Sequence, residues 1–366
     1  MMKIRKIETI PYRIPYTRPL SFATGTITAV ENVFVRIHTD EGIVGEADAP
    51  ARPYIYGESQ QSIITAINQW FLPSLNDIDL LDNEKVGHAM AWVTDNPAAR
   101  AAVDLAIWDA TGKYRQMSCG QLLGGWCDEI RVSHMIGHDL PPKMAESAVS
   151  MAEKYGINTF KVKTGTALQT DILACKLIRK ALPEANLYLD ANHGWSSAEA
   201  IAAGLALKDE GFLFFEEPSP AADRIGRRRL NQHLGLPVCG DESCRSLEEV
   251  GREISDNIAS MICIKTARTG FSESRKIAAL CEGLNVPVYV GNQGDTKTGT
   301  LANIHFACSL RHTSLYAAEL TNFLDIADDL HAEDIPIVAG KIKRPATAGM
   351  GISIDPGKLS YYRCDK

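Results

Sequence analysis

Short β-rich segments recur at nearly constant spacing through the C-terminal two thirds of the chain, and each is followed by a helical pattern. The polar residues that close five consecutive segments, Lys163, Asp190, Glu216, Asp241 and Lys265, lie 27, 26, 25 and 24 positions apart. One strand and one crossover helix need about this length, so the spacing indicates consecutive parallel strands. Eight such segments predict a (β/α)8 barrel. They cover residues 131–135, 159–163, 187–190, 212–216, 237–241, 261–265, 286–290 and 315–319.

An open, doubly wound parallel sheet is the alternative α/β fold. It would normally carry a glycine-rich phosphate turn after its first strand, and the chain contains no G-x-G-x-x-G there. The patterns Ser196-x-x-Glu199 and Ser246-x-x-Glu249 are capping boxes that start helices a few residues after a strand. The sequence therefore favours a TIM barrel, with its last repeat modified.

The N-terminal third has a different pattern, with strands first and helices later. Residues 3–50 are β-rich, and residues 97–109 have helical spacing, with Pro97 at the first helical position and Gly112 as the predicted end. This order predicts an α+β capping domain over residues 1–127. The barrel is then expected over 128–330, and a segment over 331–366 is expected to return to the capping domain.

Charge and composition exclude several classes of function. Thirty-eight basic against 45 acidic residues give a net charge of −7, which argues against nucleic-acid binding and against a polybasic membrane anchor. No apolar run is long enough to span a membrane, and the first residues do not resemble a signal peptide. Nine scattered cysteines without a C-x-x-C pair are typical of reduced thiols. We therefore expect a cytoplasmic protein with a small-molecule partner.

The predicted barrel strands end in charged residues. A charge buried there is costly unless it has a function. Asp190, Glu216 and Asp241 would meet at the C-terminal mouth of the barrel, the usual place of active sites in this fold. Three adjacent carboxylates repel one another unless a cation lies between them, and oxygen ligands favour Mg²⁺, with Mn²⁺ possible as well. The alternative is that each carboxylate caps a helix or pairs locally with a lysine.

Lysines flank the three carboxylates in sequence. Lys161 and Lys163 share one face of their strand, and Lys265 would face them across the mouth. Burial, a nearby cation and a like charge two residues away would each lower the pKa of a lysine. A carboxylate substrate bound between them could then exchange its α-carbon proton on either face.

These strand ends resemble the ordered signature of the enolase superfamily, and most closely its muconate-lactonizing (muconate cycloisomerase) subgroup. The end of the predicted capping domain and the region after the eighth strand resemble the same family. The matching segments are Lys161-Val162-Lys163, Asp190-Ala191-Asn192, Glu216-Glu217-Pro218, Asp241-Glu242-Ser243, Lys265 to Gly270, Ala106 to Asp109, Leu122 to Gly125, Glu319-Leu320 and Ala327 to Leu330.

The resemblance implies a role for each matched position. Asp190, Glu216 and Asp241 would be metal ligands, Lys163 and Lys265 the acid/base pair, and Lys161 the residue that tunes Lys163 and touches the substrate carboxylate. Two N-terminal loops, 21–25 and 50–57, resemble segments that set substrate specificity. The expected substrate-binding residues are Lys161, Asn192, Asn292, Glu319, Arg52, Tyr54, Tyr56, Phe22 and Thr24. Members of the family form multimers, so a homo-oligomer is expected.

The segment 291–295, Gly-Asn-Gln-Gly-Asp, departs from the Ser-Ser pattern of proteobacterial muconate enzymes. It resembles an actinobacterial-type branch whose members add across the double bond with anti geometry. The implied function is Mg²⁺-dependent cycloisomerisation of cis,cis-muconate, a dicarboxylate, to muconolactone through a metal-stabilised enolate.

Four other interpretations stay open. The same lysines suit a racemase or epimerase of N-acylamino acids or dipeptides, or a dehydratase similar to o-succinylbenzoate synthase. A metal-free Schiff-base aldolase and a non-catalytic binding barrel are the remaining classes. Outside the strand ends, Arg227-Arg228-Arg229 is predicted to be a solvated helix face, and His193, three residues beyond Asp190, is the histidine expected nearest the site.

Overall fold

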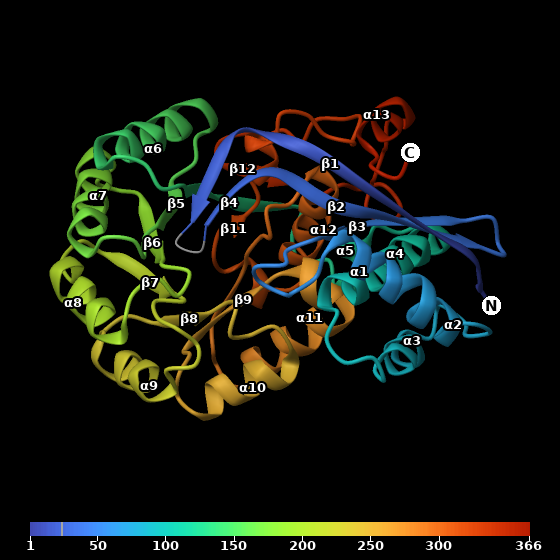
Figure 1. Cartoon of the computed structure of the whole chain (residues 1–366), viewed down its shortest axis with the longest axis horizontal. Coiled ribbons are helices and arrows are strands. Elements are labelled where there is room, and N and C mark those ends of the chain that lie inside the picture. Colours follow the sequence, from blue (N-terminus) through green and yellow to red (C-terminus); the bar gives the residue numbers. More distant parts are fainter. Residues whose placement is uncertain (23–24) are drawn as a thin grey trace.

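The computed structural model describes residues 1–22 and 25–366, and its main feature is a nearly closed parallel barrel (Figure 1). The strands are ordered β10-β9-β8-β7-β6-β5-β4-β11, and β10 lies beside β11. The eight segments expected from the sequence all form strands, which confirms the predicted barrel. Their bounds are β4 Glu129–Ile136, β5 Thr159–Lys163, β6 Asn186–Asp190, β7 Phe212–Glu216, β8 Val238–Gly240, β9 Met261–Ile264, β10 Val288–Val290 and β11 Ala318–Glu319.

Helices cover the outside of the barrel and connect successive strands. The last repeat differs, because the short 3-10 helix η3 (Asn322–Asp325) follows β11 in place of an α-helix. Another 3-10 helix, η2 (His312–Ser314), precedes β11. The connecting helices are α6 Pro141–Tyr155, α7 Leu168–Ala181, α8 Ser197–Leu207, α9 Arg224–His233, α10 Leu247–Ser255, α11 Thr266–Gly283 and α12 Lys297–Ala307.

One predicted capping box forms as expected and the other forms in part. Ser196 and Glu199 exchange both hydrogen bonds at the start of α8. At α10 the Ser246 hydroxyl accepts from the Glu249 backbone, but the Glu249 carboxylate bonds Arg245 instead. Both helices therefore start where the sequence indicated.

Alternation along the barrel strands separates two cores. Phe160 and Val162 of β5 face the surrounding helices and belong to the main hydrophobic core. A second cluster fills the inside of the barrel below its mouth. Because aromatic rings fill the barrel interior there, the polar strand ends lie above a layer of hydrophobic side chains. The interior cluster consists of Tyr188, Phe214, Cys239, Met261, Cys263 and Tyr289.

The N-terminal region contains an antiparallel sheet of β1 (Ile4–Phe22), β2 (Gly25–Thr39) and β3 (Val44–Pro50), which helices follow. Figure 1 shows the blue β1–β2 hairpin extending from this sheet toward the barrel strands. The helical elements are α1 Gln60–Thr65, η1 Ala66–Phe71, α2 Leu72–Ser74, α3 Asn83–Met90, α4 Pro97–Arg115 and α5 Cys119–Leu123. This arrangement confirms the predicted α+β cap.

The predicted end of α4 at Gly112 is wrong. The helix continues to Arg115 and ends at Gln116, whose φ is 55°. Gly112 serves close packing, because a Cβ there would lie 2.7 Å from the Cα of Gly349. Helix propensity alone therefore predicted the end of α4 about one turn too early.

The C-terminal segment connects the barrel to the N-terminal sheet. Strand β12 (Lys341–Lys343) pairs antiparallel with β4, and α13 (Pro356–Tyr362) packs against β1. The backbone N–H of Cys364 donates to Pro11 O at 2.8 Å. The division at residues 127 and 330 stays a prediction. None of the helices in the described ranges has the length and apolarity that a membrane crossing would need.

Candidate active site at the mouth of the barrel

The register of three neighbouring strands places the charged strand ends side by side. Lys163 of β5 is paired with Asp190 of β6, which in turn is paired with Glu216 of β7. Below them, the Lys161 Nζ lies 3.3 Å from an Asp190 oxygen, 2.9 Å from Glu216 and 2.8 Å from Glu319. All of these side chains are buried. The strand pattern thus gathers positive and negative groups at one level of the barrel.

Lys163 and Lys265 flank the carboxylates from opposite sides. The Lys163 Nζ lies 2.5 Å from Asp190 Oδ2 and donates to Asn192 Oδ1 at 2.7 Å. The Lys265 Nζ lies 2.5 Å from Asp241 Oδ2. β5 and the end of β9 are separated by three intervening strands, so the two ammonium groups approach the mouth from different directions.

Burial and charge shift the pKa values of this cluster strongly. Burial, reinforced by Asp190 and Asp241, raises the pKa of Glu216 well above its usual range. Burial also acts on Asp241, but Lys265 and Arg268 outweigh it and hold its pKa well below the usual range. Burial and the two neighbouring carboxylates therefore oppose ionisation of Glu216 more strongly than Lys161 and Lys265 favour it.

The chain's own carboxylates act against the expected lowering of the pKa at Lys161 and Lys265. Burial does lower both, but nearby carboxylates outweigh it, and the pKa of each lysine rises well above 10.5. For Lys161 the opposing charges come from Glu216, Glu319 and Asp190. A bound cation is not among these charges, so the lowering expected in its presence stays a prediction.

Two of the three expected ligands lie close enough together to share one cation, and the third lies beside Glu216. Carboxylate oxygens of Glu216 and Asp241 lie within 4.8 Å of each other and of the Cys263 sulfur. Asp190 and Glu216 both contact the Lys161 Nζ. Burial raises the pKa of the Cys263 thiol well above 9, which keeps it protonated and a poor ligand. The usable donors are therefore hard oxygens, and this donor set fits Mg²⁺ or Mn²⁺.

A second group of potential ligands, His193, Glu217 and Glu242, lies beside the first. Glu217 is already committed, because Arg227 Nη1 donates to it at 2.7 Å and the Asp241 backbone N–H donates at 2.7 Å. Arg227 is fully buried, so its prediction as part of a solvated face is wrong. Glu217 and Arg227 hold the end of β8 in place.

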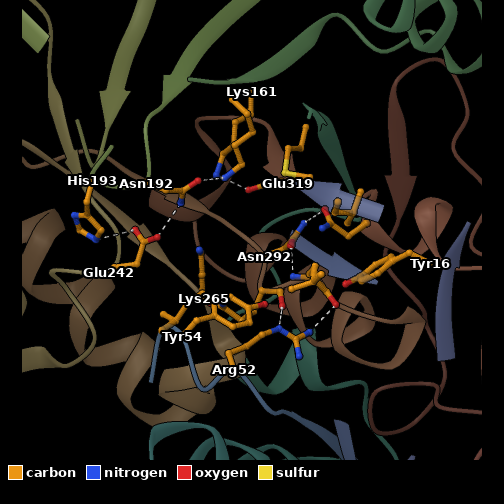
Figure 2. Close-up of a pocket in the computed structure, with 18 residues that line it drawn as sticks. Tyr16, Arg52, Tyr54, Lys161, Asn192, His193, Glu242, Lys265, Asn292 and Glu319 are labelled. Carbon is orange, nitrogen blue, oxygen red and sulfur yellow. Dashed lines mark hydrogen bonds and ion pairs between the residues drawn. The ribbon is translucent and has the colours of Figure 1, made fainter. Parts of the chain in front are cut away.

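A pocket of about 780 Å³, including the space that opens to solvent, lies above these residues (Figure 2). The barrel supplies one side, and β1, β2 and the loop after β3 supply the other. Among the predicted residues, eight line it: Lys161, Lys163, Lys265, Asn192, Asn292, Glu319, Arg52 and Tyr54. The pocket therefore combines the two regions that the sequence assigned to chemistry and to specificity.

Three predicted substrate-binding residues, Tyr56, Phe22 and Thr24, are not among the described residues that line the pocket. Tyr56 does not line the pocket, because its buried hydroxyl donates to the Gln293 side chain behind the wall. Thr24 and the side chain of Phe22 lie outside the described residues. Arg52 lines the pocket, yet its N–H groups already donate to the carbonyls of Ala51, Gln293 and Gly294.

Several residues that line the pocket were not among those predicted from the sequence. Glu242 carried a usable signal, since it follows Asp241, and its carboxylate accepts from Asn192 Nδ2 at 2.8 Å. Burial, together with Asp241 and Asp190, raises the pKa of Glu242 to about 7. Tyr16 and Asn322 carried no local signal and come from opposite ends of the chain. The other such lining residues are Leu20, Ile27, Ile55, Met135, Gln293 and Gly294, and His193, the histidine expected nearest the site, lines the pocket as predicted.

The chain matches two family profiles that together cover most of its length. Residues 143–358 match the enolase C-terminal domain-like family, and residues 6–124 match the N-terminal domain of mandelate racemase and muconate lactonizing enzyme.

Three relatives show the range of the similarity. A solved muconate lactonizing enzyme from Mycobacterium smegmatis, complexed with muconolactone, is 45% identical with a TM-score of 0.98, over 99% of this chain and all of its own. A muconolactone complex from Pseudomonas fluorescens is 26% identical with a TM-score of 0.94, over 99% of each chain. The L-Ala-D/L-Glu epimerase of Bacillus subtilis is 32% identical, over 96% of this chain and 97% of its own. By these matches, the chain belongs to the enolase superfamily, with the N- and C-terminal domains of its mandelate racemase and muconate lactonizing enzyme group.

Proposed function

We propose that the protein is a Mg²⁺-dependent muconate cycloisomerase that converts cis,cis-muconate to muconolactone. The observation that carries the proposal is the placement of Lys163 and Lys265 on two sides of the carboxylates Asp190, Glu216 and Asp241, beneath a pocket that opens to solvent. The 45% identity to a muconate lactonizing enzyme over nearly the whole chain supports the substrate.

The chain's own residues would divide the work as follows. Asp190, Glu216 and Asp241 would hold Mg²⁺, which when bound supplies positive charge for the carboxylate next to the reacting carbon. Lys161 would orient that carboxylate from below. As an oxygen of the other carboxylate adds to the double bond and closes the lactone ring, the ammonium of Lys163 or Lys265 would deliver one proton to the α-carbon.

The polar groups of the pocket suit the carboxylates of a diacid. Most of the polar lining consists of amides, hydroxyls and cationic groups, which can donate hydrogen bonds to a carboxylate. Among the described lining residues, the Glu319 carboxylate lies 2.8 Å from the Lys161 Nζ. Glu242 accepts from Asn192 with one oxygen, and its other oxygen has no hydrogen-bond partner in the described part of the chain.

The decisive assay follows the ultraviolet absorbance of cis,cis-muconate with purified protein and Mg²⁺. We expect the absorbance to fall and muconolactone to form, and we expect Lys265→Ala to bind metal while losing at least about 10²-fold in kcat. Metal-loaded protein that leaves muconate unchanged would contradict the substrate assignment. Turnover in D₂O would place one deuterium in the lactone, and its face relative to the ring oxygen would test the anti course.

Epimerisation is the second candidate, because the Bacillus subtilis relative is an epimerase and two lysines on opposite sides suit proton removal and return. Under this alternative, L-Ala-L-Glu incubated with the protein in D₂O would acquire deuterium at an α-carbon. Deuterium incorporation without any loss of muconate absorbance would favour the epimerase over the cycloisomerase.

A further inference from the structure

A chain of hydrogen bonds fixes the orientation of Asn322 at the pocket wall. The backbone N–H of Gly294 donates to Asn292 Oδ1 at 2.7 Å, and a backbone N–H can only donate. The side-chain atom of Asn292 that faces Asn322 must therefore be the amide nitrogen, and its NH₂ group donates to Asn322 Oδ1. Since its carbonyl oxygen faces Asn292, Asn322 is left with two N–H donors, which have no partner among the described residues.

Tyr16 brings a second unused donor to the same wall. Its side chain is 6% exposed and lines the pocket, yet its hydroxyl has no hydrogen-bond partner among the described residues. Burial raises the pKa of Tyr16 to about 12, so the hydroxyl stays protonated. A buried hydroxyl without a partner costs about 1–3 kcal/mol, and a phenylalanine would avoid that cost. A hydrogen-bond acceptor on a bound molecule would remove that cost.

Positive charge lies next to both donors. A Cβ built on Gly294 would be 3.0 Å from Tyr16 Oη and 3.2 Å from Arg52 Nη2, so the two groups converge on one face of this glycine. Arg52 is 3% exposed and makes no ion pair with any carboxylate of the described chain. Figure 2 shows Tyr16, Asn292 and Arg52 across the pocket from His193 and Glu242.

The backbone holds these donors at a fixed separation. Tyr16 forms a β-bridge with Ile326, directly after the 3-10 helix η3 that carries Asn322. The N–H of Ala327 donates to Pro15 O at 2.9 Å. Strand β1 and the end of the barrel thus form one rigid wall. The groups of this wall without a partner among the described residues can donate hydrogen bonds beside a guanidinium, which suits a carboxylate better than an ammonium group.

We propose that Tyr16 and Asn322, supported by the charge of Arg52, bind the far carboxylate of the substrate, the one that does not lie at Asp190, Glu216 and Asp241. This inference rests on the proposed function and makes it more specific, because it assigns the preference for a diacid to two residues. Both would contact the carboxylate that closes the ring, and neither would take part in proton transfer.

Two variants remove the donors and leave the packing intact. Tyr16→Phe deletes only the hydroxyl. Asn322→Asp keeps an acceptor for Asn292 but replaces the two N–H donors with a charged oxygen. Tyr361→Phe, at a tyrosine that is 80% exposed on α13, is the matched control. The ligands are cis,cis-muconate and its monomethyl ester, in which the far carboxylate is masked.

Each variant is expected to lower kcat/KM for muconate about tenfold or more, since one hydrogen bond to a charged group is lost. Part of the loss is expected in kcat, because the far carboxylate is the one that closes the lactone ring. Binding of the monoester should change less than about twofold, and the control should match the wild type in both. Unchanged kcat/KM for muconate in both variants, or equal losses of binding for diacid and monoester, would overturn the inference.

Calorimetric titration of muconate separates this inference from the proposed function. If the wild type binds muconate without turnover, the proposed function fails. The inference then stands if Asn322→Asp and Tyr16→Phe weaken that binding, and it is overturned if they do not. Absence of muconate binding by the wild type overturns both.

Discussion

Replacing Arg227 with leucine should destabilise the protein far more than the same change at its neighbour Arg228. The side chains of Arg227 and Glu217 are both 0% exposed, and they meet at 2.7 Å. Glu217 also accepts from the backbone N–H groups of Asp241 and Ser243 at 2.7 and 2.9 Å. Arg227→Leu would leave this buried carboxylate with His193, whose Nδ1 lies 3.3 Å away, as its remaining partner of opposite charge among the described residues.

Loss of one partner of a buried ion pair costs about 3–5 kcal/mol. For a chain of 366 residues this corresponds to a fall in Tm of about 4–7 °C. Arg228→Leu is the matched control, because Arg228 is 46% exposed and its Nε donates to a backbone carbonyl. It should change the free energy of unfolding by less than about 1 kcal/mol.

Urea unfolding, followed by circular dichroism with a common m-value, measures both variants. The double variant Arg227→Leu/Glu217→Gln should recover part of the loss, because the stranded charge is removed. Equal stability of Arg227→Leu and Arg228→Leu would contradict this prediction, since it would show that the buried Glu217 carboxylate does not depend on Arg227.

Further predictions test packing, pH dependence and the metal. Gly45→Ala should cost more than about 3 kcal/mol in urea unfolding, since its Cβ would lie 1.9 Å from Ala106 O, whereas Gly87→Ala, in an open helical position, should be neutral or stabilising. Burial raises the pKa of Glu58 to about 7, above its unfolded value near 4.5, so the free energy of unfolding should fall as pH rises from about 5 to 8. Glu58→Gln should reduce that slope, and an unchanged slope would contradict the assignment. EDTA should abolish turnover, and Mg²⁺ or Mn²⁺, followed in the absorbance assay, should restore it; activity that persists in EDTA would contradict the metal site.

The sequence by itself determined the barrel and the level at which its charges lie. Alternation in β5 requires that Lys161 and Lys163 share a face, and nearly equal intervals bring Asp190, Glu216 and Asp241 to one end of neighbouring strands. These are properties of a periodic backbone, so local patterns are sufficient to read them.

Only the tertiary structure decided how charges are balanced and which residues meet at the pocket wall. The burial of Arg227, the raised pKa of Lys161 and the joining of Tyr16 to Asn322 all depend on groups that are distant in the sequence. Burial and electrostatic energies are sums over neighbours in space, and no local pattern of residues records those neighbours.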